Sequence, residues 1–359
     1  MQTATTAITA TATADVPKEA VTPAAKKVFL RYIHSFRGIA IIFVVAGHVL
    51  LRWADGSPTH TFFRTFWENG TVLFVFMAGY LFQHLSRKFE YKDYLTKKFL
   101  NVILPYLVVS TPIIIMRLIQ HDYPGVVTDL HPDFDSWGTL NKIAYFIFHG
   151  AHLQQLWFVP MITIVYFLAP VLLYIDRHPK LYLVLLLLVP VSLIVPREPF
   201  IDIPRMFAHL ISVYVFGMLL SHYKDAYLEW AKKYWLPLTL VTAVAFGVNL
   251  YYFDELNGPL NYVHKMLFCL CFIYWLWKLD KYIPKVIGLL AELSFGIFFV
   301  HYYVLLAIRA VYWKTMGEQM PGNILNWAIS LIIGLAGSVL IIKLVQKLLP
   351  KYSKNLIGV

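Results

Sequence analysis

The chain has 359 residues, of which 59% are hydrophobic and 14% are charged, and its formal net charge is +11. Soluble domains carry about 25% charged residues, and apolar runs long enough to cross a bilayer recur along this chain. These features exclude an ordinary soluble protein and predict an all-α polytopic membrane protein. Lys and Arg in cytoplasmic loops explain the positive charge, so no nucleic-acid partner is expected.

The predicted elements fall into three parts along the chain. Residues 1–27 are rich in Ala and Thr and are expected to form a disordered cytoplasmic tail. Residues 28–350 form the predicted transmembrane region, and residues 351–359 form a second cytoplasmic tail. About ten transmembrane helices fit this region, over residues 30–52, 70–86, 99–119, 156–175, 181–196, 205–222, 234–253, 260–278, 285–311 and 323–349.

Lys and Arg are distributed unevenly between the predicted loops. With the N-terminus in the cytoplasm, most of the 31 Lys and Arg residues fall on cytoplasmic segments. The external loop 120–141 contains four Asp residues and neither Lys nor Arg. This is the positive-inside pattern, and only an even number of spans preserves it, so the N- and C-termini are both predicted to be cytoplasmic. The apolar segment 142–150 is too short to span and is expected at the interface or as a re-entrant segment.

Arg37 and His48 are the strongest candidates for a functional site. They lie eleven residues apart in the first predicted span, which places them on nearly the same helix face, about 16 Å apart along the axis. Ionisable groups at membrane depth are costly and indicate function. On the ninth span, Glu292 lies near the inner end and His301 lies at the outer depth of His48. Matched polar groups at two depths predict a polar path across the membrane.

Simpler interpretations of these residues remain open. Each histidine could only hydrogen-bond a neighbouring helix, and Arg37 could extend its side chain to the inner interface. Lys97 and Lys98 begin the third span, where they could either hold an anionic ligand at the cytoplasmic mouth or serve only as inside charges.

Other polar and aromatic residues are weaker candidates. Arg205 flanks the outer start of the sixth span, where an ion pair with Asp202 is the simpler explanation. Trp157 is typical of the aromatic residues near membrane interfaces, although an outward-facing ring could also stack on a sugar. His149 and His152 lack a third ligand at helical spacing, so no metal site is expected.

Several segments carry a family resemblance when they are taken in order along the chain. They are Ser35-Phe-Arg37-Gly38-Ile-Ala40 followed by Gly47-His48, then Leu73-Phe-Val-Phe-Met-Ala-Gly79, Lys97-Lys98-Phe-Leu-Asn101-Val-Ile-Leu-Pro105-Tyr106, Leu156-Trp157-Phe158 and Leu293-Ser294-Phe295-Gly296-Ile-Phe-Phe-Val-His301. Together they resemble the acyltransferase-3 family of integral membrane O-acyltransferases, in the form without a soluble esterase-like domain. The resemblance runs from about residue 30 to residue 345, essentially the whole hydrophobic region.

The resemblance implies an activity. Members of this family move an acyl group, usually acetyl, from cytoplasmic acetyl-CoA or another acyl-CoA to a hydroxyl of an extracytoplasmic or lipid-linked glycan. The expected location is therefore the bacterial cytoplasmic membrane, with membrane lipids and glycan-synthesis or export proteins as partners. The resemblance leaves the identity of the acceptor open.

The resemblance also assigns roles to individual residues. Arg37, with Lys97 and Lys98, would hold the CoA phosphates. His48 would act as a general base or would carry the acyl group itself. His301 would orient His48 or bind the acceptor, and Trp157 and Arg205 are further expected acceptor contacts.

Two other functions fit the same composition. A transporter or flippase of a glycan or lipid intermediate would also need many spans and a polar path, although no inverted repeat is evident. A membrane scaffold for a glycan-synthesis complex would tolerate replacement of Arg37 and His48.

Overall fold

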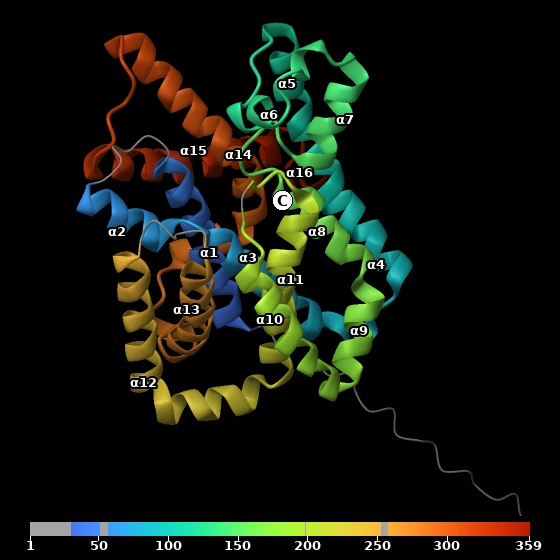
Figure 1. The fold of residues 1–359 in the computed structure, drawn as a ribbon, viewed down its shortest axis with the longest axis vertical. Helices are drawn as coiled ribbons and strands as arrows, with labels where there is room; N and C mark the ends of the chain where they lie inside the picture. Colours follow the sequence, from blue (N-terminus) through green and yellow to red (C-terminus); the bar gives the residue numbers. More distant parts are fainter. Residues whose placement is uncertain (1–29, 51–56, 198, 253–257) are drawn as a thin grey trace, which may run out of the picture. The chain divides into compact units, whose positions relative to one another are not determined.

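Helices make up most of the described part of the chain. A computed structural model of the protein describes residues 30–50, 57–197, 199–252 and 258–359, and no strand occurs among them. The predicted tail 1–27 lies outside the described residues. The chain divides into Met1–Leu30 and a unit formed by Arg31–Val359, and only this second unit is described below. The prediction of an all-helical fold is confirmed for the described residues (Figure 1).

The described residues contain sixteen α-helices. Their bounds are α1 Arg31–Val49, α2 Pro58–Trp67, α3 Gly70–Leu85, α4 Tyr91–Lys98, α5 Leu104–Gln120, α6 Gly125–Leu130, α7 Thr139–His149, α8 Phe158–Phe167, α9 Ala169–Arg177, α10 Leu185–Ile194, α11 Ile203–His222, α12 Lys224–Tyr251, α13 Pro259–Lys278, α14 Lys285–Met316, α15 Ile324–Leu348 and α16 Ser353–Ile357. A π-helical turn, Phe99–Ile103, joins α4 to α5.

Six helical stretches among the described residues are long and apolar enough to cross a membrane. They are Arg31–Val49, Tyr91–Gln120, Ile203–His222, Lys224–Tyr251, Lys285–Met316 and Ile324–Leu348. The pair α8 and α9, bent by 57°, would make a seventh. Every predicted span overlaps a helix, but α3 has only 16 residues, fewer than the about 20 that usually cross a bilayer. The count of ten and the cytoplasmic position of both termini therefore stay predictions.

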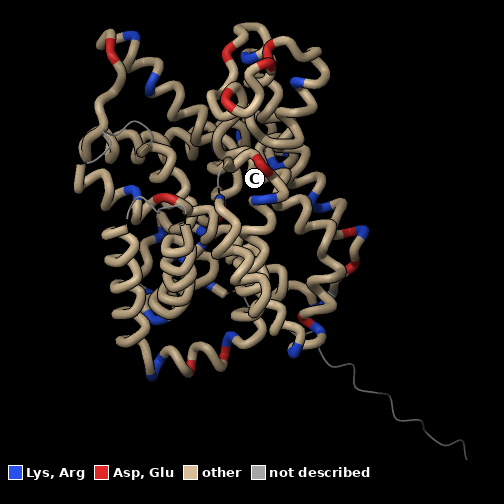
Figure 2. Tube along the Cα trace, in the orientation of Figure 1, with Lys and Arg blue, Asp and Glu red and all other residues tan. Residues whose placement is uncertain are grey.

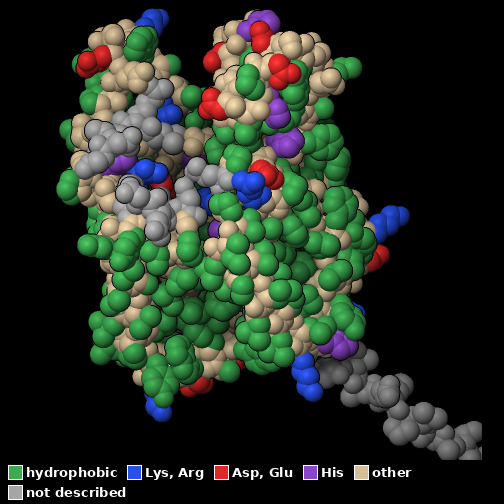
Figure 3. Space-filling model, in the orientation of Figure 1, with side chains coloured by type: hydrophobic (Ala, Val, Ile, Leu, Met, Phe, Trp, Pro, Cys, Tyr) green, Lys and Arg blue, Asp and Glu red, His purple; other side chains and the backbone are tan. Residues whose placement is uncertain are grey.

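The exposed surface of the helices is largely apolar. Figure 3 shows hydrophobic side chains covering most of the face over α10, α12 and α13, and Leu240 and Val244 of α12 are among the exposed ones. In Figure 2 many charged residues lie at the upper and lower ends of the view, and others lie at mid-height beside α2, on α4 and near the C-terminus. A largely apolar outer surface over helices long enough to cross a bilayer is what lipid contact requires, so the protein is an integral membrane protein.

Small residues let the central helices approach closely. A Cβ atom on Gly79 of α3 would clash with the backbone carbonyl of Tyr214 on α11, and one on Gly38 of α1 would clash with that of Ile287 on α14. Glycine at such contacts allows two backbones to pack closer than any side chain would permit. The approach at Gly38 fixes α1 against α14, and these are the helices that carry His48 and His301.

The segment between α5 and α8 has a small core of its own. Phe134 and Phe146 are fully buried and pack with Ile114, Val127 and Ile201. Helix α7, which covers the segment predicted to be too short to span, has 11 residues.

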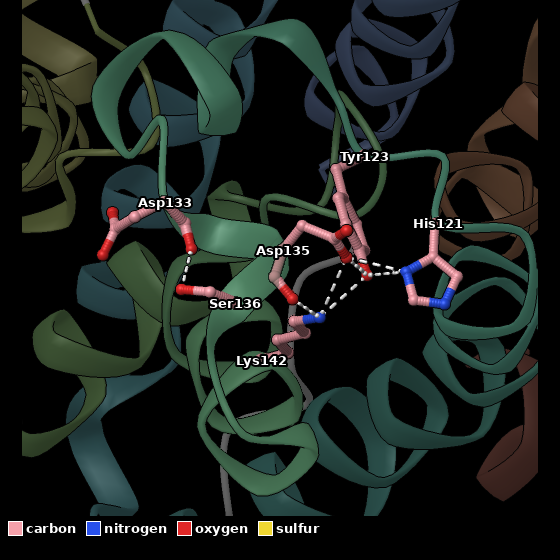
Figure 4. A network of polar contacts seen from close by, with 6 residues as sticks. All are labelled: His121, Tyr123, Asp133, Asp135, Ser136 and Lys142. Carbon is pink, nitrogen blue, oxygen red and sulfur yellow. Dashed lines mark hydrogen bonds and ion pairs between the residues drawn. The ribbon is translucent and has the colours of Figure 1, made fainter.

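A polar cluster lies beside this core (Figure 4). Asp135 accepts hydrogen bonds from His121 at 2.7 Å, Tyr123 at 2.9 Å and Lys142 at 3.2 Å. These bonds, with that from His121 contributing most, lower the pKa of the Asp135 carboxyl to about 2. The carboxylate therefore ties the two ends of the loop between α5 and α7 together.

Residues 351–359, predicted to form a tail, contain α16. This helix packs against α5, α14 and α15, and Ile357 is buried. A Cβ atom on Gly296 of α14 would contact the side chain of Val359 at 2.5 Å. The sequence did not indicate this packing, because five helical residues carry too little periodicity to reveal a buried face.

Candidate active site

His48 and His301 meet at the end of α1. The Nδ1 atom of His48 lies 3.2 Å from Nε2 of His301, and the His301 ring is fully buried. On the other side of its ring, Nδ1 of His301 lies 2.8 Å from the carbonyl oxygen of Ile297, one turn earlier on α14. The two histidines that share a predicted depth are thus in direct contact.

The hydrogen bonds of this pair determine where the protons lie. A carbonyl oxygen can only accept, so Nδ1 of His301 carries a proton, and in the neutral ring Nε2 is then an acceptor. His48 must therefore donate from Nδ1, which leaves Nε2 of a neutral His48 unprotonated. The arrangement provides one imidazole nitrogen with a free lone pair, which is what a base or a nucleophile requires.

Arg309 and Tyr302 hold the backbone and ring of His48. Arg309 donates from Nη2 to the carbonyl oxygen of His48 at 3.0 Å, which satisfies one of the carbonyls that the end of α1 leaves without a helical partner. The Arg309 guanidinium lies 5.9 Å from the centre of the Tyr302 ring. That ring meets His48 edge-on at 5.8 Å, and its hydroxyl donates to Oε1 of Gln154 at 3.2 Å.

His48 lines a cavity of about 250 Å³. Its walls come from α1, α2, the start of α3, the segment before α8, the segment before α11, and Phe298 of α14. The ionisable and amide side chains in the wall, besides His48, are Arg64, Glu68, Asn69, Gln154, Gln155 and Arg197. A polar cavity inside an apolar helical bundle is where a membrane protein usually places a functional site.

Charged side chains of the cavity wall are held by specific partners. Arg64 donates to both carboxylate oxygens of Glu68, at 2.8 and 3.3 Å, in the two-pronged geometry that guanidinium and carboxylate prefer. The guanidinium of Arg197 lies 5.7 Å from the Trp157 ring centre, so Trp157 faces both the cavity and a cation. Trp157 is therefore in the same cavity as His48.

Lys265 ties α13 to the end of α2. This side chain is fully buried, and Nζ donates to the carbonyl oxygens of Phe66 at 2.5 Å and of Thr65 at 3.2 Å. These are among the last carbonyls of α2, which a cation can cap. Because α2 supplies Arg64 to the cavity, Lys265 fixes one wall of the site from a neighbouring helix.

Arg37 lies at the opposite end of α1 from His48. Its Nε donates to the carbonyl oxygen of Ala291 on α14 at 2.8 Å, which uses one of the five N–H donors of a guanidinium. Helix α1 runs from Arg31 to Val49, so the eleven-residue separation corresponds to about 16 Å along the axis. A group bound at Arg37 and a group bound at His48 would therefore lie about 16 Å apart along α1.

Lys97 and Lys98 do not meet Arg37. Lys97 is exposed and pairs with Asp93 of the same helix at 2.6 Å. The ammonium of Lys98 lies 4.7 Å from the Tyr166 ring centre and 5.2 Å from that of Tyr94. These contacts belong to α4 and α8, and among the described residues neither lysine hydrogen-bonds or pairs with α1.

Three other predicted candidates have local roles. Arg205 lies 3.3 Å from the carboxylate of Asp202, whose side chain caps the start of α11, and it is not in the wall of the His48 cavity. His149 bonds to the carbonyl of Ile201 at 2.8 Å, and His152 bonds to Ser110 at 2.7 Å. Among the described residues no cluster of three His, Cys, Asp or Glu side chains is suited to a metal.

The sequence did not identify Arg64, Gln155, Arg197, Lys265 or Arg309 as site residues. Lys265 had a usable signal, because a lysine in the middle of an apolar span is a candidate by position alone. Gln155 and Arg197 had none, because they lie in connections between helices, where no periodicity relates them to His48.

Comparison with known proteins identifies one family. The model of the acyltransferase-3 family, described as an acyltransferase domain, matches residues 30–343. No curated protein and no solved structure matches the chain.

Proposed function

The chain belongs to the acyltransferase-3 family, whose model matches most of its length, and on that premise we propose which acyl transfer it performs. The protein moves an acyl group, most simply acetyl, from cytoplasmic acyl-CoA to a hydroxyl of an extracytoplasmic or lipid-linked glycan. Its location would be the bacterial cytoplasmic membrane. The observation that carries the proposal is the contact of His48 Nδ1 with His301, at the cavity end of the helix that also bears Arg37.

His48 would perform the transfer in one of two ways. As a general base, Nε2 takes the proton of the acceptor hydroxyl while the hydroxyl oxygen attacks the thioester carbonyl. The new C–O bond forms, the C–S bond breaks, and the proton passes from His48 to the CoA thiolate. As a nucleophile, Nε2 first forms an acyl-imidazole and releases CoA, and the acceptor hydroxyl then takes the acyl group. Both routes need the same lone pair.

Arg37 would hold the donor. A guanidinium binds phosphate by charge-assisted hydrogen bonds, and the separation of Arg37 and His48, about 16 Å along α1, is of the order of a pantetheine arm. Lys97 and Lys98 would add positive charge on α4. Their present contacts with Asp93 and two tyrosine rings would have to be exchanged for phosphate on binding.

The cavity would receive the acceptor. Trp157 offers an aromatic face on which a sugar ring can stack, and His301 would keep His48 oriented. Arg205 remains a proposed acceptor contact outside the cavity wall. Glycan-synthesis or export proteins would deliver the acceptor from the outer side.

Binding of acetyl-CoA to the detergent-purified protein tests the donor assignment. Wild-type protein should bind acetyl-CoA saturably in calorimetry, and Arg37→Ala should weaken binding by about 10-fold or more, since a hydrogen bond to a charged group contributes about 1.5–3 kcal/mol. Arg87→Ala, at an exposed position, is the matched control. Absence of binding to acetyl-CoA, succinyl-CoA and CoA would instead favour a transporter without acyl chemistry.

A second experiment tests the chemical role of His48. His48→Ala should release CoA from acetyl-CoA about 100- to 10,000-fold more slowly than wild type in membranes that contain the native acceptor, while its abundance stays near that of wild type. Turnover at the wild-type rate in this variant would refute the assignment.

A further inference from the structure

The Gln155 amide is unusual among the polar groups of the cavity wall. Its side chain is only 2% exposed, and neither Oε1 nor Nε2 has a hydrogen-bond partner among the described residues. Buried side-chain amides in folded proteins nearly always have a partner. Gln155 lines the same cavity as His48, so the absent partner can come from a molecule that occupies the cavity.

The neighbouring glutamine makes the contrast clear. Gln154 also lines the cavity, but its Oε1 accepts a hydrogen bond from Tyr302. The protein therefore uses one amide for its own structure and leaves the adjacent one unused. A side-chain amide that lacked a partner only by chance, on a flexible loop, could turn to reach another hydrogen-bond partner.

The loop that carries Gln155 does not have that freedom. Gly150 has φ +63, and a Cβ atom there would clash with the backbone of Leu156 and Trp157. Leu153 and Leu156 are buried on either side of the glutamines. The preceding turn is held by Arg117, whose Nε donates to the carbonyl of His152 at 2.9 Å. Gln155 is thus fixed by its backbone and by the packing of its neighbours.

We propose that the Gln155 amide determines acceptor specificity. It binds two adjacent hydroxyls of a sugar acceptor, next to the hydroxyl that receives the acyl group at His48. The inference rests on the proposed function, because it names what the cavity selects in the acceptor. A primary amide presents an acceptor oxygen and a donor NH₂ side by side. The matching surface is a vicinal diol, in which one hydroxyl donates to Oε1 and the next accepts from Nε2.

The size and the lining of the cavity support a sugar ring as the occupant. Its volume, about 250 Å³, is below the about 300–1,000 Å³ of pockets for drug-sized ligands, so its interior is suited to a single ring. Trp67 and Trp157 lie in the same wall and supply aromatic faces. A diol held by Gln155 would fix the ring in one orientation and so select which hydroxyl reaches His48.

Replacement of Gln155 by Met tests the proposal on the full-length, detergent-purified protein. Methionine keeps the length of the side chain and removes both polar atoms. Because no hydrogen bond within the protein is lost, the melting temperature should stay at or above that of wild type. Gln120→Met, at an exposed position at the end of α5, is the matched control.

The probes are [¹⁴C]acetyl-CoA with the methyl α-pyranosides of glucose, galactose and mannose, and the monodeoxy analogues of each. Wild-type protein should acetylate at least one glycoside and should discriminate against a deoxy analogue that lacks one hydroxyl of the diol. Gln155→Met should lower kcat/KM for the full sugar by about 10- to 100-fold, the effect of two neutral hydrogen bonds. It should also lose the discrimination, while the KM for acetyl-CoA stays unchanged.

Three results would overturn the proposal. The first is wild-type kcat/KM and discrimination in Gln155→Met. The second is acetyl transfer to the native membrane acceptor with no transfer to any of the glycosides, which would leave the acyltransferase assignment intact. The third is no acetyl-CoA binding and no CoA release with any acceptor, which would refute the proposed function and this inference with it.

Discussion

Replacement of His301 by Phe should slow acyl transfer without abolishing it. Phenylalanine has nearly the shape of histidine but cannot accept the proton of His48 Nδ1, which lies 3.2 Å from Nε2 of His301 in the native pair. The neutral His48 ring then loses the acceptor on His301 that favours the tautomer with a free Nε2, and keeps only the backbone carbonyl of Val44. His301→Gln can keep an acceptor oxygen near the same place and should restore most of the rate.

The size of the effect follows from the one hydrogen bond that is lost. A neutral hydrogen bond contributes about 1 kcal/mol net, which corresponds to a rate decrease of about 5-fold. Removal of the base itself, in His48→Ala, should cost about 100- to 10,000-fold. The two variants therefore predict clearly different rates.

The assay is the initial rate of CoA release at saturating acetyl-CoA, in membranes that contain the native acceptor and equal amounts of each variant. A rate in His301→Phe as low as that of His48→Ala would mean that His301 itself takes part in the chemistry. A wild-type rate would mean that the contact does not set the tautomer. Either result would refute the reasoning from hydrogen-bond partners.

Two further predictions concern stability and are measured as melting temperatures in detergent. Gly79→Ala should destabilise the protein by about 1–3 kcal/mol, because its Cβ atom would clash with the carbonyl of Tyr214. In the control Gly247→Ala, the Cβ atom meets nothing within 4 Å, so this variant should melt like wild type. Equal melting temperatures for the two variants would show that α3 and α11 can separate freely. Asp135→Asn should be less stable than wild type at pH 7. The native carboxyl has its pKa lowered from its ordinary value of 3.8 to about 2, so its stabilisation is present above about pH 4 and is lost as pH falls towards 2, where the two proteins should melt alike. A difference that persists at pH 2 would contradict this origin.

The helical fold and one part of the site follow from the sequence by simple rules. The apolar runs predicted a helix at each of the ten spans. Counting residues from the start of each span placed His48 and His301 at the same depth. The counting succeeds because an α-helix in a membrane has a fixed rise of about 1.5 Å per residue.

The sequence failed where the chain departs from straight spans. Residues 156–175 were predicted as one span, but α8 and α9 are bent by 57°, and Pro170 lies in the first turn of α9, a position that proline favours at the start of a helix. Helix α2 lies between the first two predicted spans, 30–52 and 70–86, and neither of them includes it, although Ser57 caps it and Pro58 begins it, both of which are recognised start signals. Because α2 was not predicted, the wall of the cavity that it forms could not be predicted either.

Lys97 and Lys98 show a different limit. Their position at the start of a span predicts positive charge on one side of the membrane, but it cannot tell in which direction each side chain points. The structure directs them to Asp93 and to tyrosine rings. Which groups they contact when the donor is bound stays a prediction.

The buried ammonium of Lys265 also has a consequence for how the cavity can open. It joins α13 to the carbonyls of Thr65 and Phe66 at the end of α2, and in a lipid-surrounded interior neither the cation nor the carbonyls would find a replacement partner easily. We therefore expect the last turn of α2 and the part of α13 around Lys265 to move together. An opening that admits a bulky acceptor past α2 would then also displace this part of α13, or would have to break both hydrogen bonds of Lys265.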